Sequence, residues 1–341
     1  MVLTLKDIDE AVRIAGNLDL AALHLGVGRR TLQRKRKLLR VTEAAAPIQT
    51  FSVEPPPPDD LTLAELIDLK KKALDRKVAK AKWSDLIPVK VNIPGPVCIG
   101  VFGDPHVDDD SCDIRTLEAD LDAISSAPYM MGLNIGDVTN NWVGRLERKY
   151  ADQIATRRHA LKLLEWVLGG DRNWLATVLG NHDLWNKGGE YINLLMQGSN
   201  GVTEAHGARM GITFPCGAVI RLHARHDFPG QSQHNPTHAL RRELEFGYRD
   251  HILVAGHRHI DGYQVVANNA EGIVSHLARV SGYKIMDDYA DEHRFIPHRM
   301  NPSIWFVIDP ANPHEPEKIK AFWDALEAKD YTEHKRRRAK V

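Results

Sequence analysis

The chain has 341 residues, 45 basic and 45 acidic side chains, and 43% hydrophobic residues. These values are ordinary for a soluble globular protein and leave room for one large domain and a small one. The zero net charge excludes a molecule that is a polycation over its whole surface. No run of about 18 apolar residues is present, so no membrane span is expected, and the N-terminus lacks the pattern of a secretion signal. Three cysteines without metal-type spacing indicate reduced thiols, so a cytoplasmic location is expected.

Residues 1–43 are predicted to form a compact unit of three helices. Thr4 is placed to cap the first helix, the second runs from about Leu18 to Leu25, and the third follows a glycine turn and is basic. This order is the layout of a helix-turn-helix. The informative strings are Ala15-Gly16-Asn17, Ala21-Ala22, Leu25-Gly26-Val27 and Arg30-Thr31-Leu32-Gln33-Arg34-Lys35. With these strings the segment 8–39 resembles the Fis-type helix-turn-helix family, whose third helix enters the major groove of DNA.

The third helix, Arg29 to about Leu39, therefore carries the expected DNA contacts. These contacts are Arg29, Arg30, Thr31, Gln33, Arg34 and Lys35. A homodimer is expected by analogy, because helix-turn-helix proteins commonly bind DNA as dimers. The alternative is a small helical dimerisation unit whose basic face is only solvated.

Proline and charge patterns divide the rest of the chain. Residues 44–60 include four consecutive prolines, which cannot continue a helix, and are predicted to be a Pro-rich linker. Residues 61–95 are predicted to hold a charged connecting helix with a solvated lysine face; tracking of DNA phosphates is the alternative. Residues 96–330 form the expected catalytic domain, which ends in a helix at about 315–329. The basic tail, 331–341, is expected to be disordered and either to solubilise the chain end or to add non-specific affinity for nucleic acid.

Short apolar runs in the catalytic domain predict buried strands of a layered α/β fold. The expected strands are 97–102, 131–135, 174–179, 218–222, 252–255 and 305–308, with helices at 114–124 and 151–168. Further strands are expected between 261 and 309. Polar motifs follow the strand ends, which is where ligands bind in open α/β sheets.

Five of these motifs are rich in Asp, His or Asn. They are Asp104-Pro105-His106, Gly136-Asp137, Gly180-Asn181-His182-Asp183, His226 and Gly256-His257-Arg258-His259. Asp104 and His106 are two apart, so on an extended segment their side chains point the same way. Gly136 leaves room for Asp137 to bridge two cations about 3.5–4 Å apart. The set predicts a centre with two divalent metal ions and the hydrolysis of a phosphate ester by a metal-activated hydroxide.

The five motifs, in this order over about 97–265, resemble the calcineurin-like metallophosphoesterase superfamily. The resemblance implies a layered β-sandwich flanked by helices and assigns ligands by position. Asp104, His106 and His259 would hold the first metal, and Asp137 would bridge. Asn181, His226 and His257 would complete the second site. At the fourth motif His223 is the alternative to His226, because the strand register decides which side chain faces the metal.

The resemblance also assigns catalytic roles to the third motif. His182 would protonate the leaving-group oxygen, and Asp183 would orient His182 and raise its basicity. Imidazole and carboxylate ligands without cysteine admit Mn, Fe, Zn, Co or Ni, and for a nuclease-like member manganese is expected.

The substrate is indicated mainly by the N-terminal unit, because tethering a nuclease to DNA raises its effective concentration there. We therefore expect a DNA nuclease. Asn140 stands where the family's DNA-repair nucleases have a histidine, although it could still donate a hydrogen bond to phosphate. His238 and Arg241, in the insertion 229–251, are further substrate candidates if that segment forms a lid; a surface loop leading into a helix from about Thr237 is the alternative. Two other functions stay open: a phosphomonoesterase or small-molecule phosphodiesterase, and a DNA-binding regulator with a non-catalytic phosphoesterase scaffold.

Overall fold

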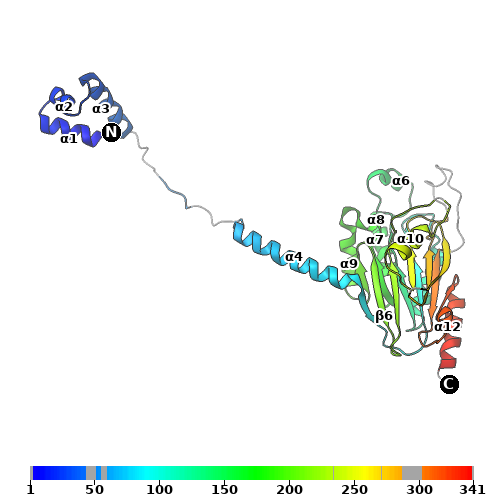
Figure 1. The fold of residues 1–341 in the computed structure, drawn as a ribbon. Coiled ribbons are helices and arrows are strands. Elements are labelled where there is room, and N and C mark those ends of the chain that lie inside the picture. Colours follow the sequence, from blue (N-terminus) through cyan, green and yellow to red (C-terminus); the bar gives the residue numbers. More distant parts are fainter. Residues whose placement is uncertain are drawn as a thin grey trace. The chain divides into compact units, whose positions relative to one another are not determined.

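The computed structural model describes residues 3–43, 51–54, 60–232, 234–269, 271–285 and 302–339. The chain divides into two compact units, Met1–Lys70 and Lys71–Val341 (Figure 1). The division falls inside helix α4, Leu63–Asp85, which was expected within 61–95 and is confirmed. None of the residues of α4 is buried. No helix of the described residues combines the length and the apolar composition that a membrane span needs.

The first unit contains three helices, as predicted. They are α1 Leu5–Ala15, α2 Leu18–His24 and α3 Arg29–Glu43. The hydroxyl of Thr4 accepts from the backbone N–H of Asp7, and the carboxylate of Asp7 accepts from the N–H of Thr4, which makes the capping box at α1. Gly26 ends α2 with a φ of 65°, while the N–H of Val27 donates to the carbonyl of Ala22. The small core of the unit comprises Ile8, Ala11, Ala21, Ala22 and Leu32.

The second unit contains two six-stranded mixed sheets. In one sheet the order is β1-β6-β7-β8-β10-β9, and in the other it is β12-β11-β2-β3-β4-β5. The strands are β1 Ile87–Lys90, β2 Val97–Phe102, β3 Met130–Asn134, β4 Trp174–Val178, β5 Val202–Glu204, β6 Ala208–Thr213, β7 Val219–Ala224, β8 Ile252–Ala255, β9 Gly262–Asn268, β10 Ile273–Arg279, β11 Ser303–Ile308 and β12 Ile319–Phe322. Strands β2, β3, β4 and β5 run parallel, and β7, β8 and β10 also run parallel.

The sheets pack face to face and each is covered by helices on its outer side. Apolar side chains of both sheets, such as Val101, Leu133, Leu222 and Val254, form the central core. The covering helices are α5 Ile114–Ser125, α7 Arg157–Leu168, α9 Gly188–Met196 and α12 Ala325–Ala339 on one side, and α10 His238–Phe246 on the other. The short helices are α6 Glu147–Tyr150, α8 Asn181–Leu184, and the 3-10 turns η1 Gly144–Leu146, η2 Trp185–Lys187 and η3 Glu315–Glu317. The expected layered α/β fold with a helical N-terminal region is confirmed.

Several expectations about element boundaries are wrong. The basic tail is not a disordered end, because α12 runs to Ala339 and buries Ala325, Ala328 and Thr332 against the sheet. Its basic residues pack on the surface; for example, the guanidinium of Arg336 lies 4.7 Å from the ring centroid of Tyr129. The helix expected at 315–329 is replaced by η3, β12 and the start of α12, and the helix expected from 151 begins only at 157. Strands β1, β5, β6 and β12 were not expected.

Candidate metal centre

The residues of the five motifs lie in loops that follow five strands. Asp104 and His106 follow β2, Asp137 follows β3, and Asn181 follows β4. His226 follows β7, and the loop with His257 and His259 follows β8. Because β2, β3 and β4 are parallel, and β7 is parallel to β8, the carboxyl ends of the strands meet at one edge of each sheet. The fold therefore collects the motifs in one place.

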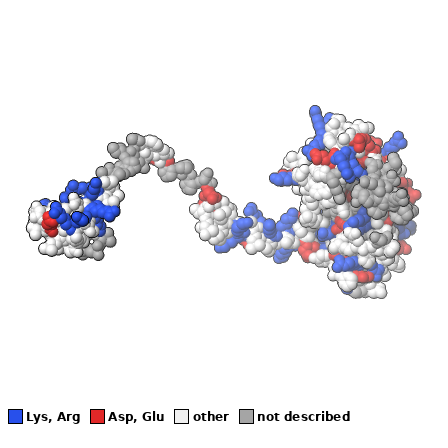
Figure 2. Space-filling model, turned by 90° about the horizontal axis from the view of Figure 1, so that it is seen from above, with Lys and Arg blue, Asp and Glu red and all other residues white. Residues whose placement is uncertain are grey.

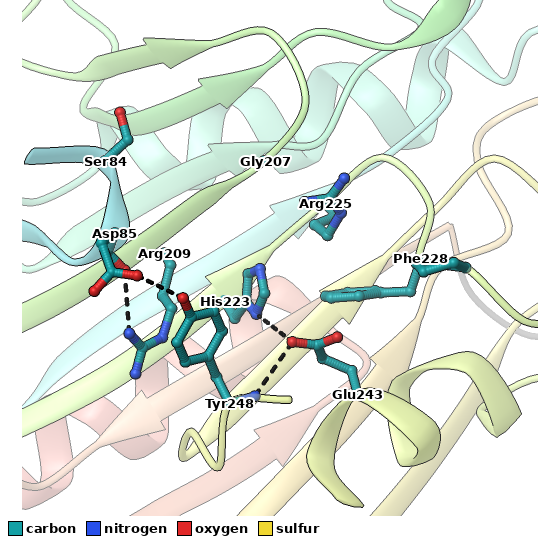
Figure 3. Close-up of a pocket in the computed structure, with 10 residues that line it drawn as sticks. Ser84, Asp85, Gly207, Arg209, His223, Arg225, Phe228, Glu243 and Tyr248 are labelled. Atoms are coloured by element: carbon teal, nitrogen blue, oxygen red, sulfur yellow. Dashed lines mark hydrogen bonds and ion pairs between the residues drawn. The ribbon is translucent and has the colours of Figure 1, made fainter. Parts of the chain in front are cut away.

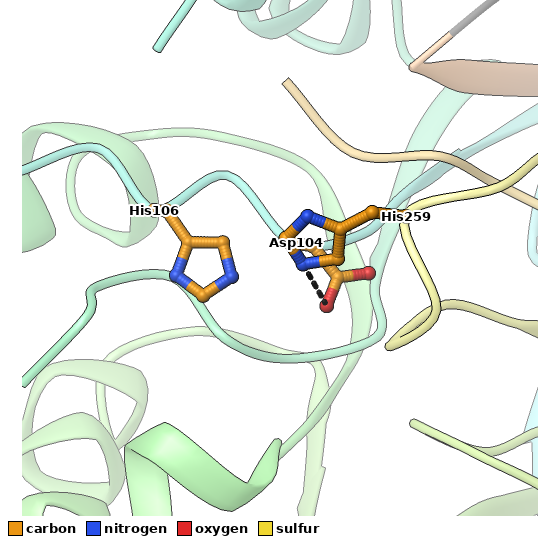
Figure 4. A group of neighbouring side chains, drawn as sticks. All are labelled: Asp104, His106 and His259. Atoms are coloured by element: carbon orange, nitrogen blue, oxygen red, sulfur yellow. Dashed lines mark ion pairs between the residues drawn. The ribbon is translucent and has the colours of Figure 1, made fainter. Parts of the chain in front are cut away.

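One group of potential ligands consists of Asp104, His106 and His259 (Figure 4). One ligand atom from each lies within 4.8 Å of the others. Asp104 is completely buried and His106 is 2% exposed, yet Asp104 Oδ1 and His106 Nδ1 have no hydrogen-bond partner among the described residues. Burial of such groups costs free energy unless something binds them. A metal ion fits this donor set, because carboxylate and imidazole are both ordinary ligands of divalent transition metals.

A second group consists of Asp137, His226 and His257, with ligand atoms again within 4.8 Å of one another. Nε2 of His226 lies 3.2 Å from Asp137 Oδ2, 3.0 Å from His257 Nδ1 and 3.0 Å from Asn181 Oδ1. The other ring nitrogen of His226 donates to the carbonyl of Ile135 at 2.9 Å. A carbonyl can only accept, so this bond leaves Nε2 as the nitrogen that faces the other ligand atoms.

His223, the alternative at the fourth motif, lies elsewhere. Its Nδ1 is 3.8 Å from Glu243 Oε1, and its ring packs edge-to-face on Phe228. The structure therefore places His226, and not His223, among the ligand candidates.

The loop backbone at the centre is unusual. Residues with a positive φ include Asp104 (48°), His106 (42°), Asp137 (53°), His257 (68°) and His259 (52°). Non-glycine residues in this region cost on the order of 1–3 kcal/mol each and persist where the surrounding structure holds them. Asp104 and His106 therefore do not lie on an extended segment, and that expectation is wrong. Their left-handed backbone conformation sets the direction of the two side chains.

Two glycines allow close packing around the carboxylate of Asp137. A Cβ on Gly136 would overlap the backbone of Gly180 and would lie 2.9 Å from Nδ1 of His226. A Cβ on Gly180 would in turn overlap the carboxylate of Asp137. Gly136 therefore permits a close approach of the Gly180 backbone and the His226 ring, while its role beside a bridging Asp137 stays a prediction.

His182 lies beside both groups. Its Nδ1 donates to the carbonyl oxygen of Asn140 at 2.8 Å, and its Nε2 is 3.9 Å from Asp137 Oδ2. Its ring also packs against Trp185, with the centroids 4.2 Å apart. Because the Asn140 carbonyl holds the hydrogen on Nδ1, Nε2 is the atom that can exchange a proton with a substrate. Burial lowers the pKa of His182.

Asp183 does not orient His182, so that expectation is wrong. Its carboxylate accepts from the backbone N–H groups of Asp137 at 2.8 Å, Val138 at 3.1 Å and Gly180 at 2.9 Å. Asp183 thus joins the second and third motif loops. Burial, followed by the charge of Asp137, raises the pKa of Asp183 to about 7.

The imidazoles of the centre have different protonation preferences. Burial lowers the pKa of His106 well below its usual value and that of His257 to about 4. At His226 burial also disfavours the charged ring, but the hydrogen bond and the charge of Asp137 outweigh burial and raise the pKa to about 10. Neutral imidazole is the form that binds a metal, so metal binding at His226 must displace a proton.

The expected substrate residues are not directed to the ligand groups. Asn140 is buried, and its side-chain amide donates to Asp109 Oδ2 at 3.0 Å; its link to the centre is its backbone carbonyl. His238 is exposed at the start of α10, and Arg241 pairs with Glu245 at 2.5 Å. Helix α10 packs on β8 and β10, which favours the alternative of a surface loop leading into a helix over a lid.

Arg279 is a residue of the centre that the motifs do not reveal. It is 3% exposed, and its guanidinium donates to the carbonyls of Gly256 and Pro236 and to Asp227 Oδ1. These bonds join the loop after β7 to the loop after β8. Arg279 lies at the end of a strand that was not separately expected, and no sequence motif includes it, so the sequence offered no signal for its role.

Comparisons with known proteins give distant similarities only. No protein-family model matches the chain, and no curated protein matches its sequence. A predicted phosphoesterase from Streptococcus pneumoniae, itself uncharacterized, is similar in structure at a TM-score of 0.32 and 11% identity, covering 68% of this chain and all of its own. Vacuolar protein sorting 29 from Cryptosporidium parvum has a TM-score of 0.35 and 13% identity, covering 68% of this chain and all of its own. The calcineurin-like phosphoesterase YfkN from Bacillus subtilis has a TM-score of 0.32 and 12% identity, covering 69% of this chain and 92% of its own. Similarity at this level carries no function from these proteins to this chain.

Proposed function

We propose that the second unit is a two-metal phosphoesterase of the calcineurin-like superfamily and that it hydrolyses phosphodiester bonds. The observation that carries the proposal is the pair of ligand groups, Asp104, His106 and His259 beside Asp137, His226 and His257. Buried atoms of Asp104 and His106 that have no hydrogen-bond partner among the described residues support it, because they suit a bound cation. The proposed metal is manganese, with Fe, Zn, Co or Ni as the other candidates.

The chain's own residues suit this chemistry. Two bound metals would polarise the phosphoryl oxygen and activate a water molecule for attack. Within the second group, Oδ2 of Asp137 lies 3.2 Å from Nε2 of His226. The other oxygen, Oδ1, accepts from the backbone N–H of His182. His182 presents Nε2 beside this carboxylate, and in the proposal it donates a proton to the leaving oxygen. The carbonyl of Asn140 holds the ring in the orientation that this transfer needs.

Hydrolysis of a phosphodiester chromogen tests the role of His182. We expect His182→Ala to keep its metal affinity and to lose about a hundredfold or more in turnover, the usual contribution of a general acid. His238→Ala, which changes an exposed histidine of α10, is the matched control and should retain full activity. Unchanged turnover in His182→Ala would remove His182 from the mechanism.

We further propose that the substrate is DNA and that the first unit is a helix-turn-helix that tethers the enzyme to it. Lys and Arg side chains gather on one face of that unit (Figure 2). On α3, Arg30, Thr31, Gln33 and Arg34 are exposed, and no ion pair to another described residue is recorded for Arg30 or Arg34. Arg29 differs, because it pairs with Asp19 at 3.3 Å. Free guanidinium groups at the start of such a helix suit contacts to phosphates and bases.

Binding of duplex DNA at several salt concentrations tests this tether. Replacing Arg30 and Arg34 together by alanine should weaken binding and reduce the slope of log affinity against log salt by about 2, since each lost phosphate contact removes about 0.9. Arg13→Ala is the matched control, because Arg13 on α1 is already paired with Glu10 at 2.6 Å. An unchanged slope in the double variant would refute the DNA contact at α3.

A further inference from the structure

A cavity of about 310 Å³ lies on the outer side of β7 (Figure 3). The lining residues that matter here are Asp85, Arg209, His223, Arg225, Phe228, Glu243 and Tyr248. His223 and Arg225 belong to the chain segment that ends in His226 of the second ligand group. Three residues span at most about 11 Å, so the backbone of this wall lies within about 11 Å of the backbone of His226.

Two of the charged side chains of the lining, Arg209 and Asp85, are already paired. Arg209 donates to both oxygens of Asp250, at 2.6 and 2.9 Å, and its guanidinium lies 3.8 Å from the ring centroid of Tyr248. The hydroxyl of Tyr248 donates to Asp85. These bonds fix one wall of the cavity before any ligand enters.

Three side chains of the lining have hydrogen-bond donors or acceptors that are not fully used. His223 is 6% exposed, and its Nδ1 has no hydrogen-bond partner among the described residues, since Glu243 at 3.8 Å is too far. Arg225 uses Nε on the carbonyl of Asp227, and no bond from its terminal nitrogens to another described residue is recorded. Glu243 accepts only weakly, from the N–H of Tyr248 at 3.3 Å. Figure 3 shows His223, Arg225 and Glu243 around the same cavity, with the ring of Phe228 beside them.

This combination excludes the simplest ligands. A bare phosphate would meet the carboxylates of Glu243 and Asp85, which repel it. A hydrocarbon would leave Arg225 and His223 without partners in a confined space, which costs free energy. A planar ring with acceptors on one edge and N–H donors on the other satisfies both ends, and its faces suit the aromatic side chains of Phe228 and Tyr248.

We propose that this cavity binds a guanine base, with Arg225 donating to its O6 and N7 and Glu243 accepting from its N1–H and N2–H. A guanidinium fork on O6 and N7 is the commonest specific contact to guanine. Among the common bases, guanine alone presents two adjacent N–H donors that match one carboxylate. Burial lowers the pKa of His223 to about 4, so at neutral pH its ring is uncharged and can meet the base without adding a positive charge. The choice of a base carried on a phosphate rests on the proposed phosphodiesterase function.

Titration calorimetry of the full-length protein in EDTA tests the site without hydrolysis. We expect GMP to bind at least tenfold more tightly than AMP, and inorganic phosphate not to compete. Glu243→Gln should weaken GMP binding at least tenfold and reduce the preference over AMP, because a neutral amide offers one acceptor oxygen where N1–H and N2–H meet two in the carboxylate. Glu245→Gln is the matched control on the same helix, since Glu245 pairs with Arg241 and does not line the cavity.

Two further arms complete the experiment. A trinucleotide with a central guanine that binds at least tenfold more tightly than GMP would assign the base to a nucleic acid strand, whereas equal affinity would assign the cavity to a free guanine nucleotide. Arg225→Gln supplies a second variant if Glu243→Gln fails to fold. Equal binding of GMP and AMP, displacement of GMP by phosphate, or no binding of GMP or the trinucleotide would overturn the proposal. Because Glu243 lies outside the metal centre, hydrolysis of a small chromogen by Glu243→Gln should equal that of the wild type, so a failed phosphoesterase proposal would be seen separately.

Discussion

Gly136 is a position where a single added methyl group should damage the candidate metal centre. In Gly136→Ala the new Cβ would overlap the backbone of Gly180 and meet Nδ1 of His226 at 2.9 Å. A flexible side chain could turn away, but a loop backbone that carries the third motif cannot do so without moving Asn181. The residue also has a φ of 106°, which alanine avoids.

The expected cost adds two effects. Overpacking of a tight site costs about 1–3 kcal/mol, and a strained backbone conformation costs about 1–3 kcal/mol more. Several kcal/mol is a large part of the stability of an ordinary domain, about 5–15 kcal/mol. The variant should therefore lower the free energy of unfolding by about 4 kcal/mol and weaken metal binding, because the loops with Asp137 and Asn181 are forced apart.

Urea unfolding followed by circular dichroism, together with manganese titration, measures both effects. Gly198→Ala is the matched control, since a Cβ at Gly198 meets nothing within 4 Å and its φ is not positive. The control should leave both quantities unchanged. If Gly136→Ala unfolded at the same urea concentration as the wild type and bound manganese equally well, the close packing of the two loops would not matter as argued.

Three other predictions follow from buried polar groups. Arg279→Met should weaken manganese binding about 10–100-fold in calorimetry, because residues that position metal ligands commonly contribute that much to metal affinity. Unchanged affinity would show that the ligand loops keep their positions without Arg279. Asp250→Ala leaves Arg209 and Arg221 without their shared partner, so the free energy of unfolding should fall by about 3 kcal/mol in urea titrations, and a loss below about 1 kcal/mol would contradict this. Burial raises the pKa of Asp120 to about 6, so the folded state holds this proton more tightly than the unfolded state and wild-type stability should fall by about 2 kcal/mol between pH 4 and pH 7 from this group. Asp120→Asn should remove that part of the pH dependence, and an identical pH profile would refute the assignment.

Much of the layered unit could be predicted from the sequence because its central strands are buried on both faces. The runs that became β2, β3, β4 and β8 are almost wholly apolar, and each ends in a polar motif. Edge strands such as β1 and β5 are short and only partly buried, so their sequences lack this signal. The prediction of a disordered tail was wrong because it was based on the charge of the last residues. The packing of Ala328 and Thr332 against the sheet depends on residues far away in the sequence.

The candidate site was predictable in its residue types but not in its local geometry. Histidine, aspartate and asparagine after strand ends indicated a metal centre, and these residues do converge. The role of Asp183 depends on three backbone N–H groups from two loops, which sequence spacing cannot reveal. The orienting partner of His182 is likewise a backbone group, the carbonyl of Asn140. Every residue type has a backbone carbonyl, so the sequence does not indicate which position provides this contact.

Digestion of circular and linear DNA, beside a phosphodiester chromogen, tests the proposed two-metal phosphoesterase most directly. The reactions contain manganese or EDTA, and each is run with the wild type and with Asp137→Ala. We expect manganese-dependent hydrolysis of both DNA and chromogen by the wild type, and its loss in Asp137→Ala. Cleavage of the chromogen with DNA intact would keep the metal centre and refute the nuclease. No hydrolysis of either substrate with Mn, Fe, Zn, Co or Ni would contradict the central claim that the clustered Asp, His and Asn side chains form a catalytic metal centre.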